Sequence, residues 1–288
     1  MNRLRISYKW QLVLPAIVVM LVVLLFPLIF SVRTSLYYYV LTNPFYHPFY
    51  WLKNYIEMVT SKGMQNSLWV TFKYSFGSVF IELVAGFTLA YFLTKINRFK
   101  NLIISILMAP MMITPIAVGL IWRLLLHPDL GIINYLLSLI GIRSIPWLGL
   151  EATALPTLMA IDAWQWTPFI MILLYAGMIS LPVETFEAAI MDGANALQQI
   201  RYVTIPMLRN VIVIAVTIRL IDSLRAYDLI YMMTRGGPGT STETFSYYVF
   251  RVAFTATNLG QASAASLLYL VIVIVISSFL FNNLKRID

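Results

Sequence analysis

Long apolar stretches constrain the fold of this chain more than any other feature. Six segments are long enough to cross a bilayer as helices, which takes about 20 residues each. Charged residues make up only 11% of the 288 residues, against about 25% in ordinary soluble domains. The sequence therefore predicts an all-α membrane protein with six transmembrane helices in a single domain, 1–288. The expected spans are 11–32, 70–94, 101–125, 155–181, 208–230 and 258–284.

The distribution of lysine and arginine predicts the orientation of these spans. With the N-terminus in the cytoplasm, inner segments hold ten basic residues and outer segments six, which agrees with the positive-inside rule. We therefore expect both termini to be cytoplasmic, and we assign the net charge of +8 to these loops and not to nucleic-acid binding. The first span is expected to be retained, because its apolar stretch exceeds that of a signal peptide and no small-residue cleavage site follows it.

Several kinds of chemistry lack their residues in this sequence. There is no cysteine, and the two histidines, His47 and His127, are far apart, so we expect no metal site. No Gly-Lys dipeptide occurs, so the P-loop that binds ATP phosphates is absent. We see no nucleophile paired with a base. The chain is therefore predicted to have no cofactor of its own and not to be an enzyme.

The loop over residues 182–209 carries the strongest local signal. Pro182 favours a helix start, and Glu184 and Glu187 suit its first turns. Gly193 permits a break, and Asn195 is a good N-cap for a second short helix. We expect two short helices on the cytoplasmic face. One side would offer a partner small apolar groups, namely Phe186, Ala189, Ile190 and Ala194.

This loop resembles the EAA loop of binding-protein-dependent ABC importer permeases. The family pattern is Glu-Ala-Ala, three residues, Gly, and later a proline that opens the fifth span. Ile205 stands where many members have leucine. The resemblance implies that the matching residues couple the permease to an ATPase subunit; they are Glu187, Ala188, Ala189, Asp192, Gly193, Ala194 and Pro206.

The resemblance covers most of the chain and is best with sugar permeases of the glycerol-phosphate/maltose type. Lys53-Asn54-Tyr55, the stretch Trp164 to Phe169 and Gly236-Gly237-Pro238 match that branch. The resemblance implies a type I importer fold in a prokaryotic plasma membrane. It also implies a second homologous permease subunit, two ATPase subunits that bind ATP and Mg, an extracytoplasmic solute-binding protein and a sugar substrate.

Polar residues inside the fourth span suggest a substrate pathway. A buried charge in a span costs roughly 2.5–3.5 kcal/mol on insertion scales. Asp162, Gln165 and Trp166 share one helical side, and a carboxylate, an amide and an aromatic ring suit a sugar. The alternative is that Asp162 pairs with an arginine and Trp166 packs.

The fifth span carries Arg219, Asp222, Arg225 and Asp228 at every third position. These charges could neutralise one another as i,i+3 pairs. Equally, Arg219, Asp222 and Ser223 could face the pathway, as matching positions do in the family.

Two residues of the third span, Met111 and Pro115, are also predicted to line the pathway. Proline frees a backbone carbonyl there, although packing around a kink explains them as well. Glu82, in the second span, we interpret as a structural or paired residue.

The predicted function is the permease subunit of an ATP-driven importer of a carbohydrate, with a neutral di- or oligosaccharide as the expected substrate. Two alternatives stay open. Arg219 could bind a phosphate, which would fit an importer of glycerol phosphate esters. Asp162 or Glu82 could relay protons in a secondary transporter.

Overall fold

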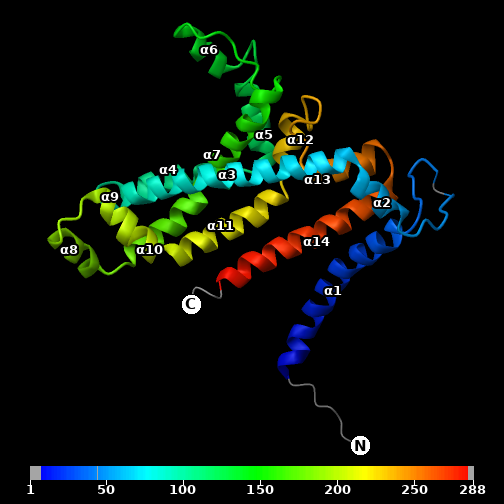
Figure 1. Ribbon diagram of the computed structural model, residues 1–288, viewed down its shortest axis with the longest axis horizontal. Helices are drawn as coiled ribbons and strands as arrows, with labels where there is room; N and C mark the ends of the chain where they lie inside the picture. The colour runs from blue at the N-terminus through cyan, green and yellow to red at the C-terminus, as the bar shows by residue number, and fades with distance from the viewer. Residues whose placement is uncertain (1–7, 44, 285–288) are drawn as a thin grey trace, which may run out of the picture. The chain divides into compact units, whose positions relative to one another are not determined.

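A computed structural model describes residues 8–43 and 45–284, with the side chains of 8–12 and 281–284 left out. Within this part, helices provide the regular structure, apart from two isolated β-bridges (Figure 1). The α-helices are α1 Tyr8–Ser35, α2 Lys53–Thr60, α3 Lys62–Lys95, α4 Lys100–Met108, α5 Pro115–Leu125, α6 Ile132–Leu139, α7 Glu151–Ile179, α8 Val183–Met191, α9 Ala196–Gln199, α10 Ile205–Met207, α11 Arg209–Leu224, α12 Asp228–Met233, α13 Phe245–Phe250 and α14 Leu259–Leu284. The 3-10 helix η1, Ala109–Met112, and the π-helices η2, Ile200–Thr204, and η3, Arg251–Thr255, complete the set.

The chain forms two compact units. Unit 1 consists of Met1–Met64 and Val249–Val271, and unit 2 consists of Gln65–Tyr248 and Ile272–Asp288. Helices α3 and α14 therefore belong partly to each unit. All of the candidate site residues lie in unit 2.

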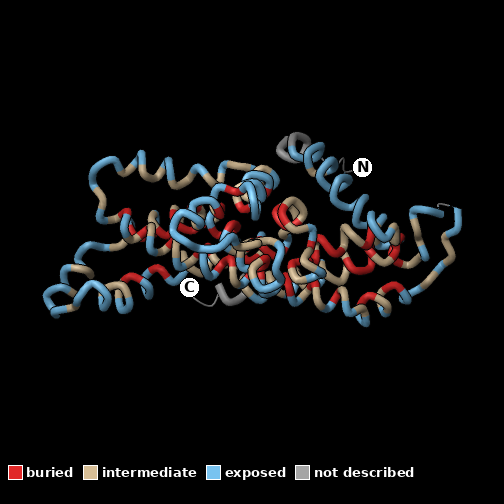
Figure 2. Tube along the Cα trace, turned by 90° about the horizontal axis from the view of Figure 1, so that it is seen from above, coloured by how far each residue is buried: buried red, intermediate tan, exposed pale blue. Residues whose placement is uncertain are grey.

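Apolar helices long enough to cross a membrane are found where the sequence predicts them. Four single helices qualify, and two bent helix pairs raise the number to six if each pair is one span. Helix α1 is exposed along almost its whole described length (Figure 2); Val19, for example, is 63% exposed. So apolar a surface is stable in lipid and not in water. The prediction of an all-α membrane protein is confirmed.

In unit 1, Asn54 of α2 forms hydrogen bonds with the end of α1 and with the segment that follows it. Its Nδ2 donates to the carbonyl oxygens of Ser35, at 2.8 Å, and Tyr37, at 2.9 Å. Gly260, at the start of α14, lies against the same segment, where a Cβ would come within 2.5 Å of the Tyr37 carbonyl oxygen. Glycine is therefore required there for close packing.

The third predicted span, 101–125, is broken and not continuous. The segment Lys100–Met112 meets α5 at 94°. Thr114 is extended and Pro115 opens α5, as expected where proline interrupts a helix. The side-chain nitrogen Nε2 of Gln165 donates to the Ile113 carbonyl oxygen at 2.8 Å, so the break leaves this acceptor satisfied by the neighbouring helix α7.

The fifth predicted span, 208–230, ends earlier than expected. Helix α11 stops at Leu224, and α12 starts a new helix at Asp228. Helix α12 packs on α5, where Arg123 Nη1 donates to the Met232 carbonyl oxygen at 3.0 Å. Gly119 allows this approach, because a Cβ there would lie 2.9 Å from the Cβ of Met232.

The core that positions the site is the contact between α3 and α7. Gly86 and Ala90 of α3 lie against Ile170 and Met171 of α7, and a Cβ at Gly86 would come within 2.9 Å of the Ile170 side chain. Small residues allow such close helix packing in a membrane. This contact fixes the spacing of the two helices one turn from Glu82 on α3 and about two turns from Asp162 on α7.

Candidate functional site

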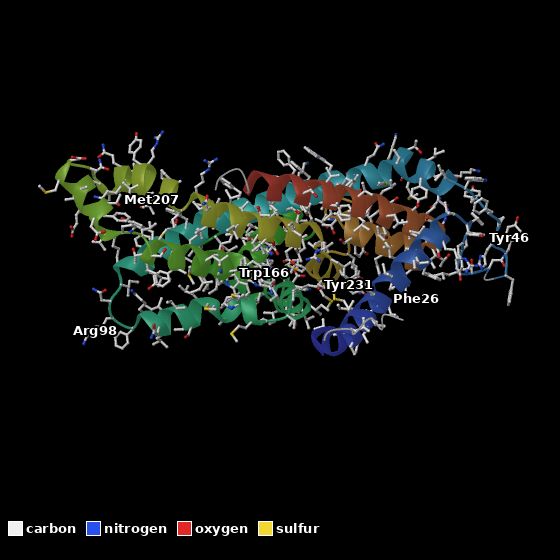
Figure 3. The ribbon with its side chains drawn as sticks, turned by 90° about the horizontal axis from the view of Figure 1, so that it is seen from below. Phe26, Tyr46, Arg98, Trp166, Met207 and Tyr231 are labelled. Carbon is white, nitrogen blue, oxygen red and sulfur yellow. The ribbon has the colours of Figure 1, made fainter. Side chains whose placement is uncertain are left out.

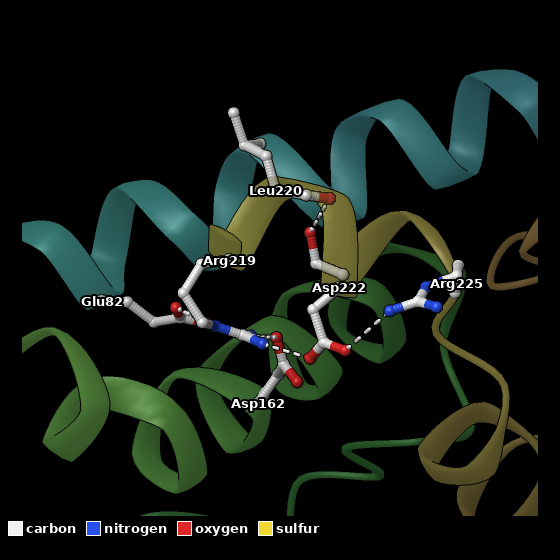
Figure 4. A network of polar contacts seen from close by, with 7 residues as sticks. Glu82, Asp162, Arg219, Leu220, Asp222 and Arg225 are labelled. Carbon is white, nitrogen blue, oxygen red and sulfur yellow. Dashed lines mark hydrogen bonds and ion pairs between the residues drawn. The ribbon is translucent and has the colours of Figure 1, made fainter. Parts of the chain in front are cut away.

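Arg219 of α11 is the centre of a cluster of charged side chains (Figure 4). Its Nε and Nη2 donate to the two carboxylate oxygens of Glu82 on α3, each at 2.7 Å. Nη2 also reaches Asp162 of α7 at 3.2 Å, and Nη1 donates to Asp222 at 2.7 Å. Arg225 adds a longer ion pair to Asp222, at 3.6 Å. One guanidinium group thus joins three helices.

The strength of these ion pairs depends on how far the side chains are buried. The Arg219 and Glu82 side chains are 2% and 0% exposed, whereas Asp222 and Arg225 are 47% and 66% exposed. The Arg219 guanidinium also lies 4.7 Å from the centroid of the Trp166 ring. A buried charge is tolerated when it is paired and hydrogen-bonded, and the bidentate contact with Glu82 meets both conditions.

The cluster has more negative than positive groups. Its carboxylates, Glu82, Asp162 and Asp222, face two guanidinium groups, those of Arg219 and Arg225. Every guanidinium nitrogen of Arg219 already donates to a carboxylate. Four of its five N–H groups are thus used, and one N–H, on Nη1, is left for an incoming anion in this conformation.

A cavity of about 240 Å³ lies beside the cluster. Residues of α3, α5, α7, α11 and α12 and of the segment that joins α11 to α12 line it. They are Tyr74, Pro115, Asp162, Gln165, Trp166, Arg219, Asp222, Ser223, Arg225, Ala226, Tyr227, Asp228 and Leu229. Along unit 2, Trp166 lies between Met207 and Tyr231 (Figure 3), so the cavity is remote from the 182–209 loop.

The cavity gathers seven of the eight residues that the sequence predicts for a substrate pathway; Met111, which lies in η1 before the break, is not among its lining residues. Two of the alternative interpretations also hold, because Asp162 pairs with an arginine and Arg219 forms an i,i+3 pair with Asp222. Asp228 lies beyond α11, at the start of α12. The role of these residues in transport stays a prediction.

Two residues of α3 belong to this site although the sequence did not place them there. Glu82 holds Arg219, and Tyr74, which is fully buried, lines the cavity. Both point from the same helix, two turns apart, as their spacing of eight residues requires. The charge of Glu82 in an apolar span was the one available signal.

The 182–209 loop forms the two short helices that its sequence predicts, with a π-helical turn after the second (Figure 1). Pro182 precedes α8, and Gly193 has φ +78°, a conformation that favours glycine. Asn195 caps α9 through a reciprocal capping box with Gln198, at 3.0 and 2.8 Å.

The exposed side of this loop differs in detail from the prediction. Glu187, Ala188, Asp192 and Gly193 are exposed, and Ala189 and Ala194 are partly buried. Phe186 turns toward its own chain, where it lines a second cavity with Lys95 and Met178 among others. The four most exposed aliphatic side chains of the loop are Val183 (65%), Ile190 (58%), Met191 (87%) and Leu197 (73%). Pro206 is exposed at the end of the loop, in α10.

Curated relatives span almost the whole chain. A probable ABC transporter permease protein, y4oQ, of Sinorhizobium fredii is 38% identical over 99% of this chain and 92% of its own length. The trehalose/maltose transport system permease protein MalF of Thermococcus litoralis is 31% identical over 96% of this chain and 92% of its own length.

A solved structure has the same fold. It is a bacterial ABC transporter involved in the import of the acidic polysaccharide alginate, with a TM-score of 0.84 and 22% identity over 97% of this chain and 96% of the other. The family model for the inner membrane component of binding-protein-dependent transport systems matches residues 75–288. This chain therefore belongs to the family of binding-protein-dependent transport system inner membrane components, and it is an ABC transporter permease.

Proposed function

We propose that the chain is one of two permease subunits in an ATP-driven importer of a neutral di- or oligosaccharide. The observation that carries this proposal is the polar cavity beside Arg219, which three apolar helices and a broken span enclose. Ionisable groups in the interior of a membrane protein usually mark a substrate or ion pathway. Both compact units would act within one permease domain, 1–288.

A neutral sugar suits the cavity better than an anion. Asp162 and Asp222 are carboxylates that can accept hydrogen bonds from sugar hydroxyls, and the ring of Trp166 can pack on the apolar face of a pyranose. An anion would meet an excess of carboxylates and an arginine whose nitrogens are all engaged. These charges argue against glycerol phosphate esters.

The 182–209 loop would connect this permease to its energy source. Its exposed apolar groups, Ile190, Met191 and Leu197, are what a helix offers to a hydrophobic groove of another protein. We infer that Glu187 and Gly193, with the rest of the matching motif, seat this loop on an ATPase subunit that binds ATP and Mg. The chain itself would hydrolyse nothing.

The proposed assembly contains a second permease, two ATPase subunits and an extracytoplasmic solute-binding protein. The chain would lie in a prokaryotic inner membrane with both termini in the cytoplasm, because that orientation puts the larger number of lysines and arginines inside. The loop and the ATPases would then share one side of the membrane.

The test is uptake by proteoliposomes that contain the complete transporter and its binding protein. The probes are glucose, maltose, trehalose, raffinose and glycerol 3-phosphate. We expect ATP-dependent uptake of one neutral sugar and none of glycerol 3-phosphate. Uptake of the phosphate ester alone would overturn the neutral-sugar assignment.

A proton-coupled secondary transporter was the alternative that the sequence left open for Glu82 and Asp162, which are buried carboxylates; membership of the ABC permease family speaks against it. Collapse of the proton gradient separates the two. Uptake that survives an ionophore and stops without ATP supports the ABC importer, whereas the opposite result supports proton coupling.

A further inference from the structure

Several side-chain donors around the Arg219 cavity are already used within the chain. The three nitrogens of Arg219 donate to carboxylates, Nε2 of Gln165 donates to the Ile113 carbonyl, and Oγ of Ser223 donates to the Leu220 carbonyl at 3.1 Å. A sugar hydroxyl is both a donor and an acceptor. The carboxylates can accept a hydrogen bond from the hydroxyl, but the oxygen of the ligand also needs a hydrogen-bond donor from the protein.

Tyr74 provides such a donor. Its side chain is 0% exposed, its hydroxyl has no hydrogen-bond partner among the described residues, and it lines the cavity. The Asp162 carboxylate is near enough to act on it both electrostatically and as a weak hydrogen-bond acceptor, and Arg219 and Glu82 act on it electrostatically. An unmade hydrogen bond at a buried group destabilises the state that contains it, so this hydroxyl gains most from a ligand that reaches it.

The size of the cavity indicates when this happens. At about 240 Å³ it is smaller than the roughly 300–1,000 Å³ of pockets that enclose a drug-sized ligand. A disaccharide therefore enters only when the cavity widens. Widening also uncovers the Tyr74 hydroxyl, which solvent does not reach in this conformation.

We propose that Tyr74 is a specificity-determining residue of the translocation pathway, which donates a hydrogen bond from its hydroxyl to an oxygen of a neutral sugar in the widened cavity. This inference rests on the proposed function. It adds a residue of α3 to a site that the sequence assigned to the third, fourth and fifth spans. It also assigns the donor role to a group other than Gln165, whose Nε2 already donates to the Ile113 carbonyl oxygen.

The test compares the wild type with Tyr74→Phe, which removes only the hydroxyl, in the complete transporter. The probes are whichever of glucose, maltose, trehalose and raffinose the wild type transports, and the monodeoxy analogues of that sugar. We expect Tyr74→Phe to take up the parent sugar roughly 2- to 13-fold more slowly, the effect of one hydrogen bond. Tyr175→Phe, a partly buried tyrosine outside the cavity, is the matched control and should transport normally.

The analogues separate sugar contact from a structural role. The wild type should transport one monodeoxy analogue more slowly than the parent sugar by a similar factor, and Tyr74→Phe should transport the two at equal rates, because the same contact is then missing in both. Copurification of the ATPase subunits with Tyr74→Phe and with the wild type checks that both complexes assemble.

Two outcomes overturn the inference alone: unchanged uptake by Tyr74→Phe, or an equal loss for the parent sugar and every analogue, which a structural role would produce. If the wild type transports none of the four sugars, the proposed function itself is wrong.

Discussion

The Arg219 cluster and the 182–209 loop lie in the same unit, but one is buried and the other is exposed. Arg219 and Glu82 are buried and satisfy each other's hydrogen bonds within the chain. Met191 and Leu197 in the loop are 87% and 73% exposed and touch little of their own chain. The cluster thus depends on this fold alone, whereas the loop exposes apolar groups that its own chain does not cover. Substitutions in the cluster should therefore destabilise the fold, whereas substitutions in the loop should weaken assembly.

Removal of the central cation should have the largest effect. Arg219→Ala leaves Glu82 and Asp162 buried without their partner, and breaking a buried pair in this way costs about 3–5 kcal/mol. We expect a strongly lowered unfolding temperature of the purified protein in detergent and loss of uptake. Arg225→Ala is the control, because its side chain is 66% exposed and an exposed pair is worth at most about 1 kcal/mol. If the unfolding temperature fell equally in both variants, Arg219 would not have the central role described above.

A charge on the exposed loop should spare the fold and weaken assembly. Leu197→Glu is expected to leave the unfolding temperature of the permease unchanged and to reduce its affinity for the ATPase subunits about 10- to 100-fold, since a buried leucine is worth about 1.5–3 kcal/mol. Copurification and binding-protein-stimulated ATPase activity measure this effect. The control is Leu130→Glu, which alters a leucine outside the loop that is even more exposed (87%). A loss of copurification in both variants would show that the effect is not specific to the loop.

The hydrogen bond at the broken third span should have an intermediate effect. Gln165→Leu leaves the Ile113 carbonyl without its donor, which costs about 1–3 kcal/mol for a buried group. We expect faster hydrogen exchange over residues 114–118, measured by mass spectrometry. Exchange over residues 83–93 of α3 should stay as in the wild type. Unchanged exchange at the break would mean that proline and packing alone hold it.

Loss of the cap of α9 should have the smallest effect. Asn195→Ala removes one half of the capping box and should destabilise this short helix by about 1 kcal/mol. Hydrogen exchange over residues 196–204 should quicken, while uptake changes less than about threefold. Asn195→Asp retains a capping oxygen and should exchange like the wild type; if it exchanges like the alanine variant, the cap is not what orders this helix.

The sequence predicted the helices well because each rests on local information. Runs of apolar residues located α3, α7 and α14, and Asn195 and Gly193 placed the boundary between α8 and α9. Pro115 marked the break in the third span, but nothing local specified an angle of 94°. The i,i+3 charges after Arg219 were interpreted as a continuing helix, whereas the packing of α12 on α5 ends α11 at Leu224.

The candidate site was only partly predictable, because its contacts join distant parts of the chain. Asp162 and Arg219 stood out as charges within apolar spans, and both line the cavity. The contact between Glu82 and Arg219 joins residues 137 positions apart, and no pattern in one sequence pairs them. Tyr74 gave no signal, because a tyrosine in an apolar helix is ordinary and its unpartnered hydroxyl is visible only in three dimensions.

The separation of Glu82 and Arg219 also matters while the protein is being made. Glu82 leaves the ribosome 137 residues before its partner, a delay of roughly 7–27 s at 5–20 residues per second. During that time α3 holds a carboxylate in the bilayer without the guanidinium that later binds it, and Asp162 arrives before the arginine as well. The nascent chain thus carries its two buried acids ahead of the one base that neutralises them. The packing of α3 against α7 therefore becomes stable only after α11 has been made and Arg219 can bind both carboxylates.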